Sequence, residues 1–448
     1  MIKDYEEKYR EYLSDESKLI GSAKSISFPK NTDEIIKILK TNKDKNVSIT
    51  IQGARSGIVG GAVPNNNHIL NTQKLTKIEK ISENEIFVES GVTLDTINSF
   101  IERNNNDYFF AVDPTEKTAT IGGVIANNSK GPNSHYYGDP SKYIEEITVI
   151  YSDLTVETLT KTDKKFFTFF GSEGIFGLII SARIKLIKKP EISWGISFFF
   201  NTINDVCGFS NELKTIKPIN TAKIVAAEFM EKSIIELIEP FKETMSNIKA
   251  IPSIPKGNNH LIYVEIHSDS ENDFELIVEL LIDLAMKYNS DVDNAWAVSE
   301  AKDLENIRNY RHAAAECTNM ILETRRKDIP NINKVSLDIS IKEDFETTLN
   351  RFNKIDIDKV IFGHIFSSNI HLNFLPKTIN EFEKAKIIAK LISLNAINNN
   401  GIIISEHGVG KVKKDIFLGS SKTEDIEKIV TTKKILDKIN LFNPNNII

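Results

Sequence analysis

Hydrophobic and polar positions in the first part of the chain alternate between helical and strand periods. The capping pair Asn31/Thr32 follows Pro29 and precedes a helix with apolar residues on one side. The stretch 47–51, VSITI, then alternates as a strand does. Residues 85–105 give a strand, a glycine turn and a second helix, and residues 180–186 alternate again. Mixed helix and strand structure is therefore predicted up to Pro190.

The second part of the chain shows strands with longer helices between them. The stretches SWGISFFFN, HLIYVEIHS and VSLDISI are typical of strands, and residues 271–289 of an amphipathic helix. A further helical pattern, ENIRNYRHAAAECTNMILETRR, covers residues 305–326 and places Arg308 and Arg311 on successive turns. Strands and helices together are therefore predicted in this part as well. The N-terminal residues 4–13 are predicted to form a short polar helix, as a surface arm.

Three glycine-rich loops interrupt the first part. The loop 52–64, QGARSGIVGGAVP, directly follows a predicted strand, and its backbone N–H groups suit a pyrophosphate. Its spacing matches neither the P-loop nor the Rossmann fingerprint, and glycines more often serve tight turns. A second loop, near residues 112–138, is rich in hydroxyl and amide side chains, and a third begins at Phe169. Such loops suit a large polyoxygenated cofactor better than a packed core.

Two segments near the C-terminus concentrate side chains that bind metals or move protons. Residues 363–376 contain His364 and His371, and residues 404–414 contain Glu406 and His407. In one continuous strand, histidines seven residues apart would face opposite sides, but a turn at residues 367–369 would bring them together. On histidine spacing alone, a metal-dependent hydrolase is a fair hypothesis, although it leaves the glycine loops unexplained.

Composition limits the class of protein. The 448 residues are 40% hydrophobic, enough for about three domains, and the net charge of −6 comes from interspersed acids and bases. This pattern argues against nucleic-acid binding and leaves a peripheral membrane contact open. No apolar run is long enough for a membrane span and residues 1–10 are charged throughout, so a cytoplasmic location is expected, with a peripheral position at the inner face of the membrane as the alternative. Two cysteines cannot ligate an iron–sulfur cluster, which would need a partner chain.

The three loops in this order, followed by the two C-terminal segments, resemble the FAD-linked D-2-hydroxyacid dehydrogenases of the vanillyl-alcohol oxidase superfamily. The resemblance covers residues 28–448 and includes the D-lactate dehydrogenase and glycolate oxidase flavoprotein types. It implies an α+β fold with a two-part FAD domain, an antiparallel-sheet cap and a C-terminal segment that returns to the flavin. The expected boundaries are 1–25 for the arm, 26–190 for the FAD domain, 191–400 for the cap and 401–448 for the returning segment.

By this resemblance, the three loops hold a non-covalent FAD. The first loop would bind the pyrophosphate, the second the ribityl chain and ring, and the third the adenosine end. The residues implied are Gly53, Arg55, Ser56, Gly57, Gly60 and Gly61 in the first, Asp113, Thr120, Gly122, Gly123, Asn127 and Ser129 in the second, and Glu173, Gly177 and Ile179 in the third. Gln52 and Arg55 depart from the family pattern, which does not affect backbone donors.

The resemblance also implies the site chemistry. His364, His371 and Glu406 would bind a divalent metal, zinc or manganese, and His407 would be the general base. Arg311 would bind the substrate carboxylate, and Lys334 is a second candidate for this contact. Asn369 would lie beside the substrate.

The predicted activity is oxidation of a small D-2-hydroxy acid, such as D-lactate, to the 2-oxo acid. Glycolate or D-2-hydroxyglutarate are alternative substrates, and the electron acceptor would be a quinone, an electron-transfer flavoprotein or an iron–sulfur subunit. Phe366, Ser367 and Ser368 depart from the family pattern. A flavin-bearing subunit with a degraded site is therefore a further hypothesis.

Overall fold

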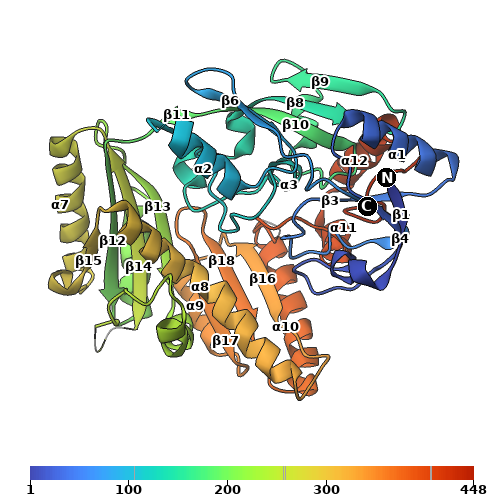
Figure 1. The fold of residues 1–448 in the computed structure, drawn as a ribbon. Coiled ribbons are helices and arrows are strands. Elements are labelled where there is room, and N and C mark those ends of the chain that lie inside the picture. The colour runs from blue at the N-terminus through green and yellow to red at the C-terminus, as the bar shows by residue number, and fades with distance from the viewer. Residues whose placement is uncertain (105, 256, 258, 404–405) are drawn as a thin grey trace. The chain divides into compact units, whose positions relative to one another are not determined.

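The computed structural model divides into two compact units, residues 1–189 with 406–448 and residues 190–405 (Figure 1). It describes residues 1–104, 106–255, 257, 259–403 and 406–448. Residue 105, at the end of the second predicted helix, and residues 404 and 405, at the start of the second C-terminal segment, lie outside this range. None of the described helices is both long and apolar enough to cross a membrane.

The first unit contains a four-stranded and a five-stranded sheet, with strand orders β1-β2-β4-β3 and β5-β6-β10-β8-β9, and a two-stranded pair of β7 and β11. The strands are β1 Ile2–Asp4, β2 Ser22–Ser27, β3 Ile49–Gln52, β4 Asn65–Asn71, β5 Ile78–Lys80, β6 Glu85–Glu89, β7 Tyr108–Phe109, β8 Ile144–Ile150, β9 Val156–Thr160, β10 Leu178–Lys185 and β11 Ile187–Lys188. The helices are α1 Thr32–Asp44, α2 Leu94–Asn104, α3 Ile121–Asn127, α4 Ser134–Tyr137, α11 Lys414–Ser420 and α12 Thr423–Leu436, with 3₁₀ turns η1 Glu7–Leu13, η2 Pro140–Lys142 and η3 Phe166–Phe169.

Helix α1 begins where its capping sequence predicts. The Asn31 side chain accepts a hydrogen bond from the Glu34 N–H, so one otherwise unpaired donor of the first turn is satisfied. Ile35, Ile38 and Leu39 are fully buried against strands β3 and β4, in one cluster with Ile49 and Leu70. The predicted helix is therefore confirmed, and its apolar face forms the core of this sheet.

The C-terminal residues complete the first unit. Phe442 forms a parallel bridge with Ile49, and the Asn443 side chain accepts from the Ile51 N–H at 2.7 Å. Asn446 donates to the carbonyl of Gly61. The chain end thus packs beside β3 and reaches the first glycine loop.

The predicted N-terminal surface arm is wrong. Strand β1 pairs with β2 in antiparallel register, and the predicted helix is the 3₁₀ helix η1. Tyr9 is buried in a cluster with Ile26 and Ile69, and Tyr12 packs edge-on against Phe28. The segment is rich in charged residues, but the rings of its tyrosines provide enough apolar surface to pack against the sheet.

The second unit is built on one seven-stranded antiparallel sheet, order β15-β12-β14-β13-β17-β18-β16 (Figure 1). The strands are β12 Ile192–Phe200, β13 Lys223–Met230, β14 His260–Ser268, β15 Trp296–Val298, β16 Val335–Ser340, β17 Lys359–His364 and β18 Asn369–Phe374. The helices are α5 Ile203–Leu213, α6 Lys232–Ile238, α7 Glu271–Lys287, α8 Ala301–Arg326, α9 Phe345–Asn353 and α10 Ile379–Asn398, with 3₁₀ turns η4 Glu239–Thr244 and η5 Val292–Asn294.

Helices cover both faces of this sheet. Phe198 and Phe200 of β12 contact Phe209 of α5 on one face, where Phe229 also contacts Phe345 of α9. On the other face, α8 places Tyr310, Ala313 and Cys317 in one cluster with strand residues that include Phe362. Successive strand residues point to opposite faces, so the sheet separates two apolar cores.

His68 of β4 gives the first unit a specific pH dependence. It is fully buried, and the hydroxyl oxygens of Ser25 and Ser27 lie 2.8 Å and 2.7 Å from its two ring nitrogens. Burial lowers its pKa to about 4. An unfolded histidine titrates near ~6.5, so protonation favours unfolding, and stability present at pH 7 is lost as the pH falls from 6.5 towards 4.

We therefore expect this histidine to lower the free energy of unfolding by about 2 kcal/mol between pH 7 and pH 5. Urea denaturation at both pH values, for wild type and His68→Gln, measures its share. The comparison is needed because burial also lowers the pKa of His260 to about 4. Equal losses in the two proteins would show that His68 does not cause them.

Candidate active site

The first and second glycine loops lie against each other in the first unit. A Cβ atom on Gly53 would come within 2.1 Å of the Thr120 hydroxyl, and one on Gly122 within 2.7 Å of the Ser90 Cβ. The same addition to Gly57 would meet nothing within 4 Å. The first loop is therefore closely packed at its start and open at Gly57.

Buried polar atoms without a partner surround these loops. Among the described residues, they include the hydroxyls of Ser90 and Thr120, the Asn128 Oδ1 and the Arg55 Nη1. A buried polar group without a hydrogen bond costs about 1–3 kcal/mol, so such a concentration indicates a ligand rich in donors and acceptors. FAD has that chemistry, and the residues present fit it.

Several residues of the first and second loops have structural partners as well. Arg55 stacks on the ring of Tyr12 at 4.2 Å and pairs with Glu11 at 3.1 Å. Asp113 pairs with Lys117, and the Ser129 hydroxyl accepts from the Asn127 amide. The cofactor contacts of these residues and of Ser56, Gly60, Gly61 and Gly123 stay predictions.

Glu173 contacts the 408–410 segment, and its expected contact with adenosine stays a prediction. Its carboxylate accepts hydrogen bonds from the N–H groups of Val409 at 2.6 Å and Gly410 at 2.8 Å. Both Glu173 and Gly174 adopt positive φ angles, 49° and 72°, so the third loop curls the carboxylate towards the 408–410 segment. Burial raises the pKa of the Glu173 carboxyl, while the two N–H donors act in the opposite direction. Gly177 packs against the Ile150 carbonyl and Ile179 is buried in β10, so their adenosine contacts stay predictions.

Glu173 and Asn127 together hold the segment that carries Glu406 and His407. Asn127 donates to the Glu406 carbonyl at 3.3 Å. At Gly408, with φ of +80°, a Cβ atom would lie 2.6 Å from the Asn127 Oδ1 and 2.8 Å from a Glu173 oxygen. Only glycine allows this close approach. The proposed base is thus fixed to the FAD domain through its backbone neighbours.

Replacing Glu173 with glutamine should loosen this segment. An amide has one acceptor oxygen, and its NH₂ group would face an N–H donor, so about 1–3 kcal/mol of local stability should be lost. The amide hydrogens of Val409 and Gly410 should then exchange with deuterium about 10- to 100-fold faster. Glu157→Gln is the matched control, because Glu157 bonds Tyr151 and Lys165 elsewhere in the unit. Unchanged exchange in Glu173→Gln would show that the Glu173 carboxylate does not hold the 408–410 segment in place.

The second unit brings the two predicted metal-binding histidines together. Strands β17 and β18 form a hairpin around Ile365–Ser368, with His364 opposite Asn369 and Phe362 opposite His371. Opposite residues share a face, and so do residues two apart in one strand, so His364, Phe362 and His371 lie on the same face. Phe362 packs in the cluster with α8, so both imidazoles point to the side that α8 covers. Their ring centroids are 5.2 Å apart, and each ring offers a nitrogen within 4.8 Å of one on the other. The predicted turn is confirmed.

Each of these histidines has a buried carboxylate near its Nδ1 atom. The Nδ1 of His364 lies 2.5 Å from Glu228 of β13, and the Nδ1 of His371 lies 4.0 Å from Asp338 of β16. Histidines that bind metals usually donate their other ring N–H to a carboxylate, which leaves Nε2 for the metal. Sequence reasoning missed Glu228 and Asp338. The available signal was a lone carboxylate in each apolar strand, KIVAAEFM and VSLDIS, since buried charges need partners.

Arg311 of α8 belongs to the same cluster. Its Nε donates to Glu228 at 3.0 Å, and its guanidinium lies 4.4 Å above the Phe362 ring. Arg308, one turn earlier on α8, binds Glu265 through both Nε and Nη2. The structure therefore favours Arg311, whose Nη groups are not used by its bond to Glu228.

Lys334 is not brought into this cluster. It precedes β16 by one residue, about 13 Å along the strand direction from Asp338. Its Nζ donates to Asn319, two helical turns beyond Arg311 on α8. Its predicted substrate contact receives no support from this placement. Glu406 and His407 belong to the first unit, so their share in the site stays a prediction.

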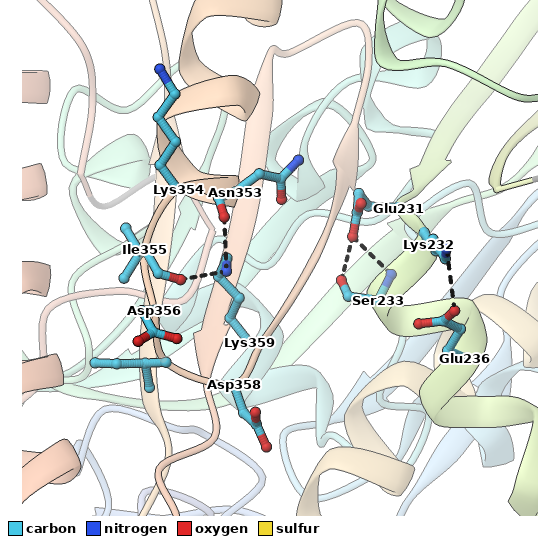
Figure 2. Close-up of a pocket in the computed structure, with 11 residues that line it drawn as sticks. Glu231, Lys232, Ser233, Glu236, Asn353, Lys354, Ile355, Asp356, Asp358 and Lys359 are labelled. Carbon is cyan, nitrogen blue, oxygen red and sulfur yellow. Dashed lines mark hydrogen bonds and ion pairs between the residues drawn. The ribbon is translucent and has the colours of Figure 1, made fainter.

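A surface pocket of about 500 Å³ lies elsewhere in the second unit (Figure 2). Its lining comes from the start of α6 and from residues 353–359, between α9 and β17. Its side chains bond within the protein, as Lys359 does to the Ile355 carbonyl and Glu231 to Ser233. None of the site residues expected from the sequence lines it.

The fold is similar to that of solved enzyme structures. The structure of 4-ethylphenol oxidase from Gulosibacter chungangensis, in complex with isoeugenol, aligns with a TM-score of 0.74 and 14% identity. The alignment covers 100% of this chain and 94% of that one. The family described as FAD binding domain matches residues 23–160. The expected α+β fold of the vanillyl-alcohol oxidase type is confirmed.

The family described as FAD linked oxidases, C-terminal domain, matches residues 196–447, more than half of the chain. The chain belongs to this family and is an FAD-linked oxidoreductase. A D-lactate dehydrogenase of Archaeoglobus fulgidus is 26% identical over 440 residues, 94% of this chain and 90% of the relative. The glycolate oxidase subunit GlcD of Bacillus subtilis is 27% identical over 447 residues, 94% of this chain and 87% of the relative. These matches decide against the metal-dependent hydrolase.

Proposed function

We propose that this protein oxidises a small D-2-hydroxy acid, such as D-lactate, to the 2-oxo acid. The observation that carries the proposal is the cluster of His364 and His371 on one sheet face with Arg311 of α8, in which Glu228 contacts both His364 and Arg311. Two imidazoles can hold a cation for the hydroxyl, and a guanidinium can bind a carboxylate. These two groups are neighbours in a 2-hydroxy acid. The names of the relatives support the same substrate class.

The predicted site residues would have separate roles in substrate orientation, metal binding and proton transfer. Arg311 orients the carboxylate, and Asn369, opposite His364 in the hairpin, lies beside the substrate. His364 and His371, with Glu406, would hold zinc or manganese. His407 takes the hydroxyl proton, which suits a side chain with an unperturbed pKa near ~6.5. When bound, FAD would accept the hydride from C2, and the cation would lower the pKa of the hydroxyl.

Reduced flavin must then pass its electrons to an acceptor. A quinone, an electron-transfer flavoprotein or an iron–sulfur partner chain are the proposed classes. Both cysteines of this chain, Cys207 and Cys317, are buried in the second unit, and burial raises the pKa of each thiol. An iron–sulfur cluster would therefore belong to another chain.

A dye-linked assay of the full chain tests the proposal. D-lactate, glycolate, D-2-hydroxyglutarate and their L-enantiomers, where they exist, are offered with an artificial electron acceptor. Reduction of the dye with formation of the 2-oxo acid is expected for a D-2-hydroxy acid, and the ranking separates the alternative substrates. If no hydroxy acid reduces the dye although FAD is bound, the protein is a flavin-bearing subunit of another kind.

A further inference from the structure

Glu228 lies between two groups that the proposed function uses separately. It stands on β13 directly opposite His364 on β17, and its side chain is 3% exposed. One carboxylate oxygen is 2.5 Å from the His364 Nδ1, and the other accepts from the Arg311 Nε at 3.0 Å. One buried carboxylate therefore contacts both the predicted metal ligand and the predicted carboxylate clamp.

The chemistry of the carboxylate fixes the protonation of the imidazole. An ionised carboxylate only accepts hydrogen bonds, so the proton of a neutral His364 must lie on Nδ1. The lone pair is then on Nε2, the atom that a metal needs. The bond to the Arg311 Nε likewise leaves the Nη1 and Nη2 edge of the guanidinium for a bidentate carboxylate.

We propose that Glu228 is a positioning residue that sets the His364 tautomer for metal binding and holds Arg311 in the same geometry. This inference rests on the proposed function. It also gives a reason for the charge buried in the apolar strand KIVAAEFM, since a buried carboxylate needs partners.

A neighbouring pair on the same sheet face provides a matched control. Glu265 of β14 is equally buried, at 2% exposed, and pairs with Arg308, one turn before Arg311 on α8. It also accepts from the Tyr263 hydroxyl and contacts the His267 Nε2 at 3.0 Å. Neither Arg308 nor His267 is a predicted site residue. Glu265 is therefore as buried as Glu228 and is also paired with an arginine of α8, but it contacts no predicted site residue.

The test compares Glu228→Gln with Glu265→Gln in the full-length protein carrying FAD. In Glu228→Gln, the amide oxygen should accept from Arg311, which only donates, so the NH₂ group faces His364. The imidazole must then accept at Nδ1 and carry its proton on Nε2, where the metal should bind. Titration with Zn²⁺ against a chromophoric chelator should show a Kd raised about 10- to 100-fold. Glu265→Gln should change it less than about threefold, and both should retain FAD.

A second measurement keeps the inference testable if Glu228→Gln does not fold. In wild-type protein without metal, nitrogen-15 spectra of labelled histidine should show His364 protonated at Nδ1, with His364→Asn giving the assignment. Protonation at Nε2, or an unchanged Kd in folded Glu228→Gln, would overturn the inference and leave the proposed oxidation intact. Wild-type protein that binds no Zn²⁺ yet oxidises a hydroxy acid would overturn the metal site itself.

Discussion

Replacing His371 with alanine should remove the bound divalent metal and slow flavin reduction by a D-2-hydroxy acid about 10²- to 10³-fold, while FAD stays bound. His371 is one of the two imidazoles that the β17–β18 hairpin brings together, and one imidazole with one carboxylate is a poor site for zinc. Loss of the cation removes several kcal/mol of stabilisation of the developing charge on oxygen. FAD should remain, since the loops predicted to hold it belong to the first unit. Metal analysis and anaerobic stopped-flow spectroscopy measure the two effects.

His267→Ala is the matched control for this variant. His267 is a buried histidine of the same unit, and its Nε2 contacts Glu265 at 3.0 Å. Its loss should leave metal content and flavin reduction within about threefold of wild type. Full turnover in His371→Ala would contradict the metal assignment, and equal losses in both variants would indicate a general effect on the unit.

Replacing Arg311 with lysine should lower kcat/KM for the hydroxy acid about 10- to 100-fold, because an ammonium group cannot form two parallel hydrogen bonds to a carboxylate. The lysine still neutralises Glu228, so the protein should fold. Truncation to alanine would leave that carboxylate buried without a cation, at a cost of about 3–5 kcal/mol. Steady-state kinetics with the preferred substrate measure the effect.

Arg308→Lys separates recognition from packing. Both arginines lie on α8 and pair with a buried glutamate of the sheet, but only Arg311 neighbours His364 through that glutamate. We expect less than about threefold loss for Arg308→Lys. A larger loss there than in Arg311→Lys would move the carboxylate clamp to Arg308.

Local signals predicted much of the fold. The cap at Asn31 placed the start of α1, and the alternating stretches placed β12, β14 and β16. His364 and His371 are seven residues apart and would face opposite sides of one continuous strand. A turn between them brings them to one face, and the hairpin contains this turn. In each case the deciding interaction lies within a few residues, so it can be predicted without knowledge of the tertiary structure.

The partners of the site residues could not be predicted in this way. Glu228 and His364 are 136 residues apart, and their contact depends on β13 and β17 being neighbours in the sheet. Glu173 reaches Val409 across 236 residues, a contact that no pattern within the third loop indicates. Strand order follows from the packing of the whole unit, and no local pattern encodes it.

The most direct test of the proposed function is anaerobic mixing of the purified protein with D-lactate and, separately, with L-lactate, followed by the visible absorption of oxidised flavin. The proposed site predicts that the D-enantiomer, or another D-2-hydroxy acid in its place, bleaches the flavin in a single turnover and leaves one equivalent of 2-oxo acid, whereas the L-enantiomer does not. Flavin that stays oxidised with every D-2-hydroxy acid, or protein that carries no releasable FAD, would contradict it.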